Sequence, residues 1–226
     1  PTRTVTVVVS ITAIAIATTI IALIIATTAT SASAPTYPYN DIQELQTVIN
    51  IIQQERTSEN IAFFHKTNVD VTKPFMDIVA PDAIFPNTIL SPQTKRLFLR
   101  ILLYIIANNP LLHATSLFFK FYYSRTRPYK RFPQQITPLS TSTSEHTPSY
   151  PSSHSLQAFA IQKHLTKLYP EHAAQVSTTA NRIADSRVIG GVHYPSDKEF
   201  ARHQLQIFRG YEPRETKQKT KTGQNN

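Results

Sequence analysis

The sequence predicts an all-α protein, a single-domain helical bundle with its active site between helices, preceded by a signal peptide or an anchor helix. Apolar residues recur at intervals of three and four, no segment shows convincing strand alternation, and only 4 of 226 residues are glycine. Scarce glycine argues against glycine-rich nucleotide-binding folds. The absence of cysteine excludes disulfide scaffolds, cysteine nucleophiles and cysteine-based metal sites.

Residues 5–26 form an uncharged apolar segment at the start of the chain. Arg3 precedes it and the small-residue stretch TATSASA follows it, which is the pattern of a secretory signal peptide. An uncleaved anchor is the first alternative, because a helix of this length crosses a bilayer core, and a buried segment is the second. We therefore expect a signal peptide or N-terminal anchor in residues 1–34 and an exported protein of the bacterial periplasm. The protein is expected to be membrane-anchored if residues 1–34 remain attached.

The domain proper is expected over residues 35–208. A first helix follows Asn40 or Asp41, which serve as its N-cap, and a second helix is expected over residues 58–66. Four prolines in residues 68–92 leave room only for short helices there. Two apolar helices are expected at residues 94–107 and 111–123; each is too short to span a membrane, so we interpret both as core helices.

Residues 132–151 are rich in proline, serine and threonine and predict a loop. Helices are expected after this loop at residues 152–168 and 171–188. Ser196 and Glu199 have the spacing of a capping box and predict the start of a last helix that runs towards Phe208. The polar, basic residues 209–226 are expected to be a disordered tail.

The net charge of +9 is spread unevenly. Residues 37–208 carry 17 basic and 12 acidic side chains, a mild surplus that is compatible with an anionic ligand. We expect no nucleic-acid partner, because the basic run from Arg125 to Arg131 is explained by the anion site described next.

Three short segments, which we call islands, hold most of the residues that could take part in binding or catalysis. They are KFYYSRTRP from Lys120, PSSH from Pro151 and SRVIGGVHYPSD from Ser186. Lys120 and Arg127 are separated by about two helical turns, so both can face one pocket from a single helix. With Arg187 they supply the positive clamp that a tetrahedral dianion such as phosphate requires.

The other two islands add hydrogen-bond donors and imidazoles. Ser152 and Ser153 lie at an expected helix start, where free backbone N–H groups attract anions. Asp197 follows His193 by four residues and can hold one ring nitrogen while the other keeps its lone pair for nucleophilic attack. His154 is then placed to protonate a leaving oxygen. Gly190 and Gly191 permit a close backbone approach or a sharp reversal before His193.

These islands resemble the three-part signature of the type 2 phosphatidic acid phosphatase superfamily, which vanadium-dependent haloperoxidases share. The tract from Ser149 to Asp197 is most similar to class A-type nonspecific acid phosphatases, and the likeness extends over about 100 residues. The family usually has glycine where this chain has Ser153. A helical backbone tolerates serine at that position, whereas a left-handed one costs about 1–2 kcal/mol and loosens the site.

The resemblance implies roles for eight residues. The phosphate-binding residues would be Lys120, Arg127, Ser152, Ser153 and Arg187. His193 would be the nucleophile that forms a phosphohistidine, His154 the general acid, and Asp197 the carboxylate that orients His193.

The activity so implied is hydrolysis of phosphate monoesters, favoured at acid pH, by an acid phosphatase that needs no metal or other cofactor. Vanadate is expected to bind as a transition-state-like inhibitor. The partner is a small phosphorylated substrate, membrane contact is limited to an uncleaved N-terminal segment, and a homo-oligomer is left open. A lipid-phosphate or diphosphate phosphatase, a vanadate-dependent haloperoxidase and a degenerate phosphate-binding domain are the alternatives.

Overall fold

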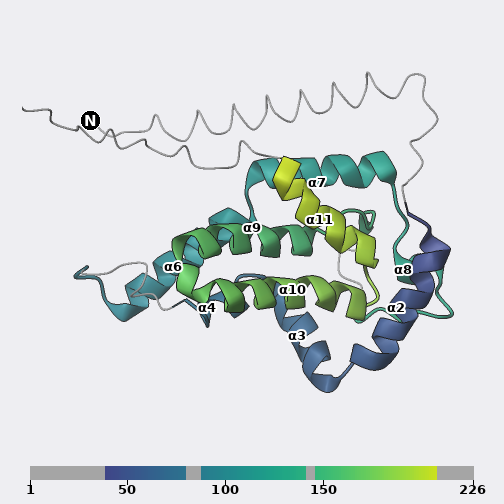
Figure 1. Ribbon diagram of the computed structural model, residues 1–226, viewed down its shortest axis with the longest axis horizontal. Helices are drawn as coiled ribbons and strands as arrows, with labels where there is room; N and C mark the ends of the chain where they lie inside the picture. Colours follow the sequence, from purple (N-terminus) through teal and green to yellow (C-terminus); the bar gives the residue numbers. More distant parts are fainter. Residues whose placement is uncertain (1–38, 80–87, 141–145, 208–226) are drawn as a thin grey trace, which may run out of the picture.

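The computed structural model describes residues 39–79, 88–140 and 146–207, and Figure 1 shows their arrangement. Every regular element in these ranges is helical, which confirms the predicted fold class. The expected leader at residues 1–34 and the expected basic tail at residues 209–226 lie outside the described residues.

The first two described helices each begin directly after a residue whose side chain caps the helix. Helix α2 (Asp41–Glu55) begins after Asn40, whose Oδ1 accepts from the backbone N–H groups of Ile42 and Gln43 at 3.0 and 3.3 Å. Helix α3 (Ser58–Val69) begins after Thr57, which caps it through Asn60 N–H, and it continues three residues past the expected end. The short helix α4 (Lys73–Met76) follows, as the proline-rich composition predicted.

Helices α6 (Pro92–Ala107) and α7 (Pro110–Tyr123) are apolar on more than their core faces. Leu99 and Leu103 are fully buried, but Ile105 on the opposite face of α6 is 60% exposed and Phe121 on α7 is 59% exposed. The interpretation as core helices therefore holds for one face of each helix. In the described residues, the stretch 92–131 is apolar and long enough to cross a membrane by length and composition, and 28% of its most apolar window is buried.

The C-terminal half supplies the centre of the bundle. It contains α8 (Pro128–Arg131), α9 (Ser153–Leu168), the 3-10 helix η2 (Pro170–His172), α10 (Ala173–Ile189) and α11 (Pro195–Ile207). The predicted capping box at Ser196 is wrong, because α11 begins one residue earlier, at Pro195. The Ser196 hydroxyl instead donates to Glu44 Oε1 at 2.6 Å.

Helix α9 lies in the middle, with α10 alongside it and α6, α7 and α11 packed around the pair (Figure 1). Side chains from these helices and α4 form the main core, in which Phe75, Ile161, Leu165 and Ile183 are fully buried. A smaller apolar cluster, with Val48 and Tyr194 fully buried, joins α2 to the start of α11. This second cluster places α2 directly behind the functional site.

Candidate active site

A cavity of about 350 Å³ opens where the end of α7, the start of α9 and the end of α10 meet. We call it the His193 cavity. The structure brings six of the eight predicted site residues to its wall, namely Lys120, Arg127, Ser153, His154, Arg187 and His193. Ser152 and Asp197 lie behind the wall, fully buried.

Lys120 lies in the last turn of α7, whereas Arg127 lies beyond this helix and is the N-cap of α8. The expectation that a single helix carries both is therefore wrong, although both side chains line the cavity. Lys120 Nζ donates to Pro148 O at 2.7 Å, and Arg127 Nε donates to Thr147 O at 2.9 Å. Both cations thus hold the loop before α9 in place. Burial, reinforced by the nearby Arg127, lowers the pKa of Lys120 to about 7, against the opposing effect of Asp197.

Arg187 lies in the last turn of α10 and is 1% exposed. Its guanidinium donates to Asn68 Oδ1 at 2.9 Å and to Thr67 Oγ1 at 2.8 Å, and it lies over the ring of Phe64, 4.2 Å from the centroid. A Cβ on Gly190 would lie 2.3 Å from that ring, so glycine is needed for α3 to approach so closely. Gly191, at φ +73°, makes the reversal towards His193.

The contacts of His193 define its tautomer. Nε2 lies 3.1 Å from Arg127 Nη1, and a guanidinium can only donate, so Nε2 accepts and carries no proton. Nδ1 therefore holds the proton and donates it to Asp197 Oδ2 at 3.0 Å. Burial, followed by the charges of Arg127 and Lys120, holds the pKa of His193 well below its usual value.

His154, in the first turn of α9, is the second imidazole of the cavity. Its Nε2 lies 3.4 Å from Asn68 O. Burial, with Arg187 as the next cause, lowers the pKa of His154 to about 3. Both rings are thus neutral in the empty site at neutral pH. A bound dianion acts in the opposite direction, because negative charge stabilises the imidazolium form.

The two serines have different positions. Ser152 is the N-cap of α9: its Oγ accepts from Ser155 N–H at 3.3 Å, and its own N–H donates to Asp197 O at 3.2 Å. Ser153 is the first residue of α9, lines the cavity, and places its Oγ 3.1 Å from Ser116 Oγ. Ser153 is not among the described residues with positive φ, so the family's usual glycine is not required by the backbone here.

Sequence reasoning missed several residues of the site. Asn68 accepts a hydrogen bond from Arg187 and lies next to His154, and His113 also lines the cavity. Arg125 lies behind Asp197, with Nη1 2.5 Å from Asp197 Oδ1. Its place in the first island, two residues before Arg127, was the one signal that could have revealed it.

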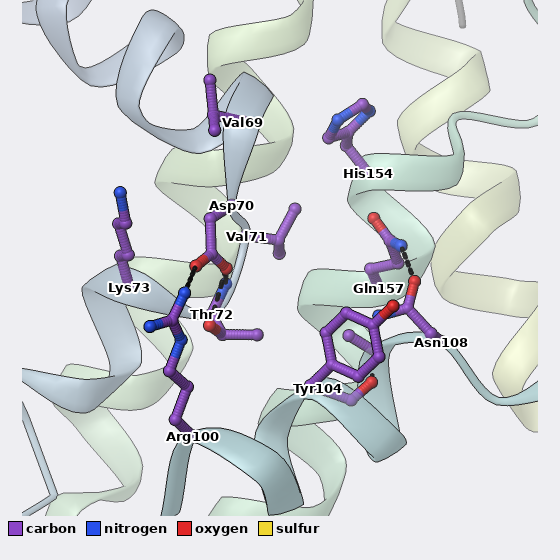
Figure 2. Close-up of a pocket in the computed structure, with 11 residues that line it drawn as sticks. Val69, Asp70, Val71, Thr72, Lys73, Arg100, Tyr104, Asn108, His154 and Gln157 are labelled. Carbon is purple, nitrogen blue, oxygen red and sulfur yellow. Dashed lines mark hydrogen bonds and ion pairs between the residues drawn. The ribbon is translucent and has the colours of Figure 1, made fainter. Parts of the chain in front are cut away.

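A second cavity of about 370 Å³, which we call the Tyr104 cavity, adjoins the first at His154, Asn108 and Gln157. Figure 2 shows His154, Gln157 and Tyr104 along one side of it and the segment from Val69 to Lys73 along the other. Arg100 and Asp70, whose charged atoms are 3.8 Å apart, form an ion pair on the side opposite Gln157 and Tyr104. Its wall is therefore part apolar and part hydrogen-bonding.

The whole arrangement is suited to hold a tetrahedral anion. Three buried cations and the N-terminus of α9 converge on one cavity with an unprotonated imidazole nitrogen between them. Among the described residues, no group of three or more His, Asp or Glu side chains has the geometry to hold a metal ion.

Known proteins match the segment that builds this cavity. Residues 98–202 match the family model described as PAP2 superfamily, and this segment includes all three islands. The chain is 33% identical over 85 residues to a non-specific acid phosphatase of Salmonella typhimurium (strain LT2) and, equally, to one of Salmonella typhi. The matches cover 37% of this chain and 34% of each relative, so the chain spans about a third of the length of these curated relatives.

A solved structure aligns with most of this chain. It is described as the first transmembrane PAP2 type phosphatidylglycerolphosphate phosphatase from Bacillus subtilis. The sequence identity is 16% and the TM-score 0.47, with 90% of this chain and 97% of that chain covered.

Proposed function

We propose that this protein is a phosphatase that hydrolyses small phosphate monoesters through a phosphohistidine on His193. The observation that carries the proposal is the unprotonated Nε2 of His193, held by Arg127 in a cavity that Lys120 and Arg187 also line. The PAP2 match over residues 98–202 and the similarity to non-specific acid phosphatases support the same reaction class.

In the first half-reaction, the lone pair of His193 Nε2 attacks phosphorus and the bond from phosphorus to the ester oxygen breaks. The three cations compensate the charge on the phosphoryl oxygens in the transition state, a role that metal ions take in other phosphoryl-transfer sites. The proton on His193 Nδ1 stays with the ring, and Asp197 Oδ2 stabilises the positive charge that develops there. No metal is required for this scheme.

His154 is proposed to give a proton to the departing oxygen. It then accepts a proton from the water that attacks the phosphohistidine, which releases phosphate and restores both rings. Because the pKa of His154 is about 3 in the empty site, its protonation depends on the bound dianion and on acid pH. This dependence is the physical basis of the expected acid preference.

The leaving group is proposed to occupy the Tyr104 cavity. This cavity borders His154, so an alcohol leaving from the phosphorus atom would enter it beside the proton donor. The wall of this cavity combines an aromatic ring, Tyr104, with two polar pairs, Gln157–Asn108 and Asp70–Arg100. Such a wall suits leaving groups of varied polarity. Export to the periplasm, with a cleaved or retained N-terminal segment, is proposed from the sequence pattern of residues 1–34.

The test is hydrolysis of a chromogenic aryl phosphate from pH 4 to 9 with excess chelator. We expect chelator-resistant activity that is strongest at acid pH, is inhibited by vanadate and disappears in His193→Ala. Parent protein that is quenched and denatured in SDS at alkaline pH should carry an acid-labile, base-stable phosphate. His172→Ala is the matched control, since His172 is a histidine of η2 that lines neither cavity.

The alternatives have distinct outcomes. A folded parent that binds phosphate without covalent labelling would be a phosphate-binding domain. Loss of activity with chelator would contradict the metal-independent scheme, and bromide oxidation with added vanadate and peroxide would identify a haloperoxidase.

A further inference from the structure

Arg125 is a buried cation that the proposed reaction does not use directly. Its side chain is 1% exposed, and the guanidinium contacts groups from two distant helices. Nη1 donates to Asp197 Oδ1 at 2.5 Å and to Ser196 Oγ at 2.7 Å, both on α11. Nε donates to Asp41 Oδ1 at 3.0 Å and Nη2 to Glu44 Oε1 at 3.0 Å, both on α2.

The local backbone directs Arg125 inward. Ser124, the C-cap of α7, has φ 46° and ψ 36°, a left-handed conformation that serine seldom adopts. This turn takes the chain out of α7, and Arg125 O then accepts from Ser149 N–H at 2.8 Å. The guanidinium lies over the ring of Tyr194, 3.7 Å from its centroid. Helix, loop and ring therefore fix Arg125 before any substrate binds.

Glu44 adds further contacts between α2 and the first turn of α11. Its Oε2 accepts from Ser196 N–H at 3.0 Å, and its Oε1 accepts from the Ser196 hydroxyl as well as from Arg125. The first turn of α11, which carries Asp197, is thus held by α2 through one carboxylate and one guanidinium. Helix α2 lies outside residues 98–202, the segment that matches the PAP2 model.

We propose that Arg125, held by Glu44 and Asp41 of α2, is the positioning residue of the His193–Asp197 pair. By fixing Asp197 Oδ1, Arg125 leaves Oδ2 directed at His193 Nδ1, which in turn keeps the lone pair of Nε2 in the cavity. The expected effect on kcat rests on the proposed function. The expected orientation of Asp197 and His193 does not.

The experiment compares the full chain with Arg125→Lys, Glu44→Gln and Arg131→Met. A lysine keeps the positive charge but cannot contact Asp197, Glu44 and Asp41 together, because it lacks the forked donors. Arg131 is the matched control: it also pairs with Asp41, at 3.4 Å, but its side chain is 47% exposed and makes no contact with Asp197. The measurements are kcat and KM with an aryl phosphate, and the proton NMR signal of His193 Nδ1–H.

We expect Arg125→Lys to lower kcat about 10–100-fold, as the loss of a supporting contact to a reactive group does, with KM little changed. Glu44→Gln should lower kcat less and in the same direction, and Arg131→Met should match the parent. The low-field Nδ1–H signal, assigned by its loss in His193→Ala, should move or broaden in Arg125→Lys, do so to a smaller extent in Glu44→Gln, and stay unchanged in Arg131→Met.

A purely structural role predicts a different result. Folded Arg125→Lys and Glu44→Gln with the parent's kcat and the parent's Nδ1–H signal would overturn the proposal. If Arg125→Lys does not fold, Glu44→Gln decides by the same two measurements. A parent without phosphatase activity would contradict the proposed function, while the Nδ1–H signal would still test whether Arg125 positions Asp197.

Discussion

The guanidinium of Arg127 lies 3.1 Å from Nε2 of His193, and this contact determines the protonation of the imidazole. A donor-only group at Nε2 forces the proton onto Nδ1, where Asp197 accepts it. The cation that is expected to bind phosphate thus also prepares the nucleophile. We therefore expect phosphate binding and the orientation of the His193 ring to be coupled through Arg127.

Replacing Asp197 by asparagine tests this coupling. An asparagine amide can donate to Nδ1, which moves the ring proton to Nε2 and places it against Arg127. We expect kcat for aryl phosphate hydrolysis to fall roughly 10³–10⁴-fold, the order of loss seen when a buried aspartate that fixes a histidine tautomer becomes asparagine. Steady-state kinetics on the folded variant measure the effect.

Asp185→Asn is the control for that substitution. Asp185 pairs with Lys198 at the surface, its side chain is 48% exposed, and it touches no residue of the cavity. We expect it to keep the activity of the parent. An Asp197→Asn variant within tenfold of the parent would contradict the assigned tautomer.

Lys120 is expected to set the alkaline limit of activity. Its pKa of about 7 means that the empty site loses one of its three cations as the pH rises through 7. Because kcat/KM reports the groups of the free enzyme, it should fall above that pH. In Lys120→Arg the side chain stays charged, so the alkaline fall should move to higher pH even if the maximum is lower. An unchanged alkaline limb in this variant would assign the fall to another group.

Anion binding is expected to take up protons. A phosphate or vanadate dianion raises the pKa values of Lys120 and His154, whose values in the empty site are about 7 and about 3. At pH 7.5 Lys120 is mostly neutral in the empty site and should gain a proton on binding. Titration calorimetry with sulfate, a tetrahedral dianion that carries no proton at this pH, in two buffers of different ionisation enthalpy measures this uptake, and identical heats in both buffers would contradict it.

The helices and most of the cavity were predictable because their signals are local. Asn40 as a cap, apolar spacing and proline positions gave the helix bounds to within a few residues. The six predicted site residues that line the His193 cavity lie in the three islands. They could be predicted because each island lies at or near the end of a helix that borders the cavity. Residues 98–202, which match the PAP2 model, contain the same three islands.

The rest depends on tertiary contacts that spacing does not encode. Glu44 and Ser196 are 152 residues apart, and nothing in the local sequence distinguishes Glu44 from any other glutamate on a helix. Ser196 and Glu199 matched a capping box by chance, because Ser196 points to Glu44 instead. The apolar pattern of α6 predicted helix correctly, but an apolar residue such as Ile105 carries no information about which face is covered.

Ser153→Gly tests whether the departure from the family's glycine weakens the site. Ser153 has a helical position at the start of α9, so glycine relieves no strain there and adds backbone freedom. We expect the free energy of unfolding to drop by about 0.5–1 kcal/mol and the activity to stay close to the parent's. Urea denaturation and kcat/KM measure the two effects. A large gain in activity would show instead that serine obstructs the cavity.

Gly190→Ala should damage the site from a distance. The added Cβ meets the Phe64 ring at 2.3 Å, so either the ring or α10 must move. Phe64 lies under the Arg187 guanidinium at 4.2 Å and its carbonyl accepts from Arg187 Nη2 at 3.0 Å, so that movement should displace Arg187, which is proposed to bind phosphate. We expect a loss of about 1–3 kcal/mol in the free energy of unfolding, typical of overpacking.

The same substitution should weaken vanadate binding, and the double variant with Phe64→Leu separates the two effects. A smaller side chain at position 64 makes room for the new Cβ and should recover stability, but it removes the ring beneath Arg187. Vanadate affinity should therefore remain low in the double variant while stability returns. If vanadate binds both variants as tightly as the parent, Phe64 does not position Arg187, and Gly190 serves packing alone.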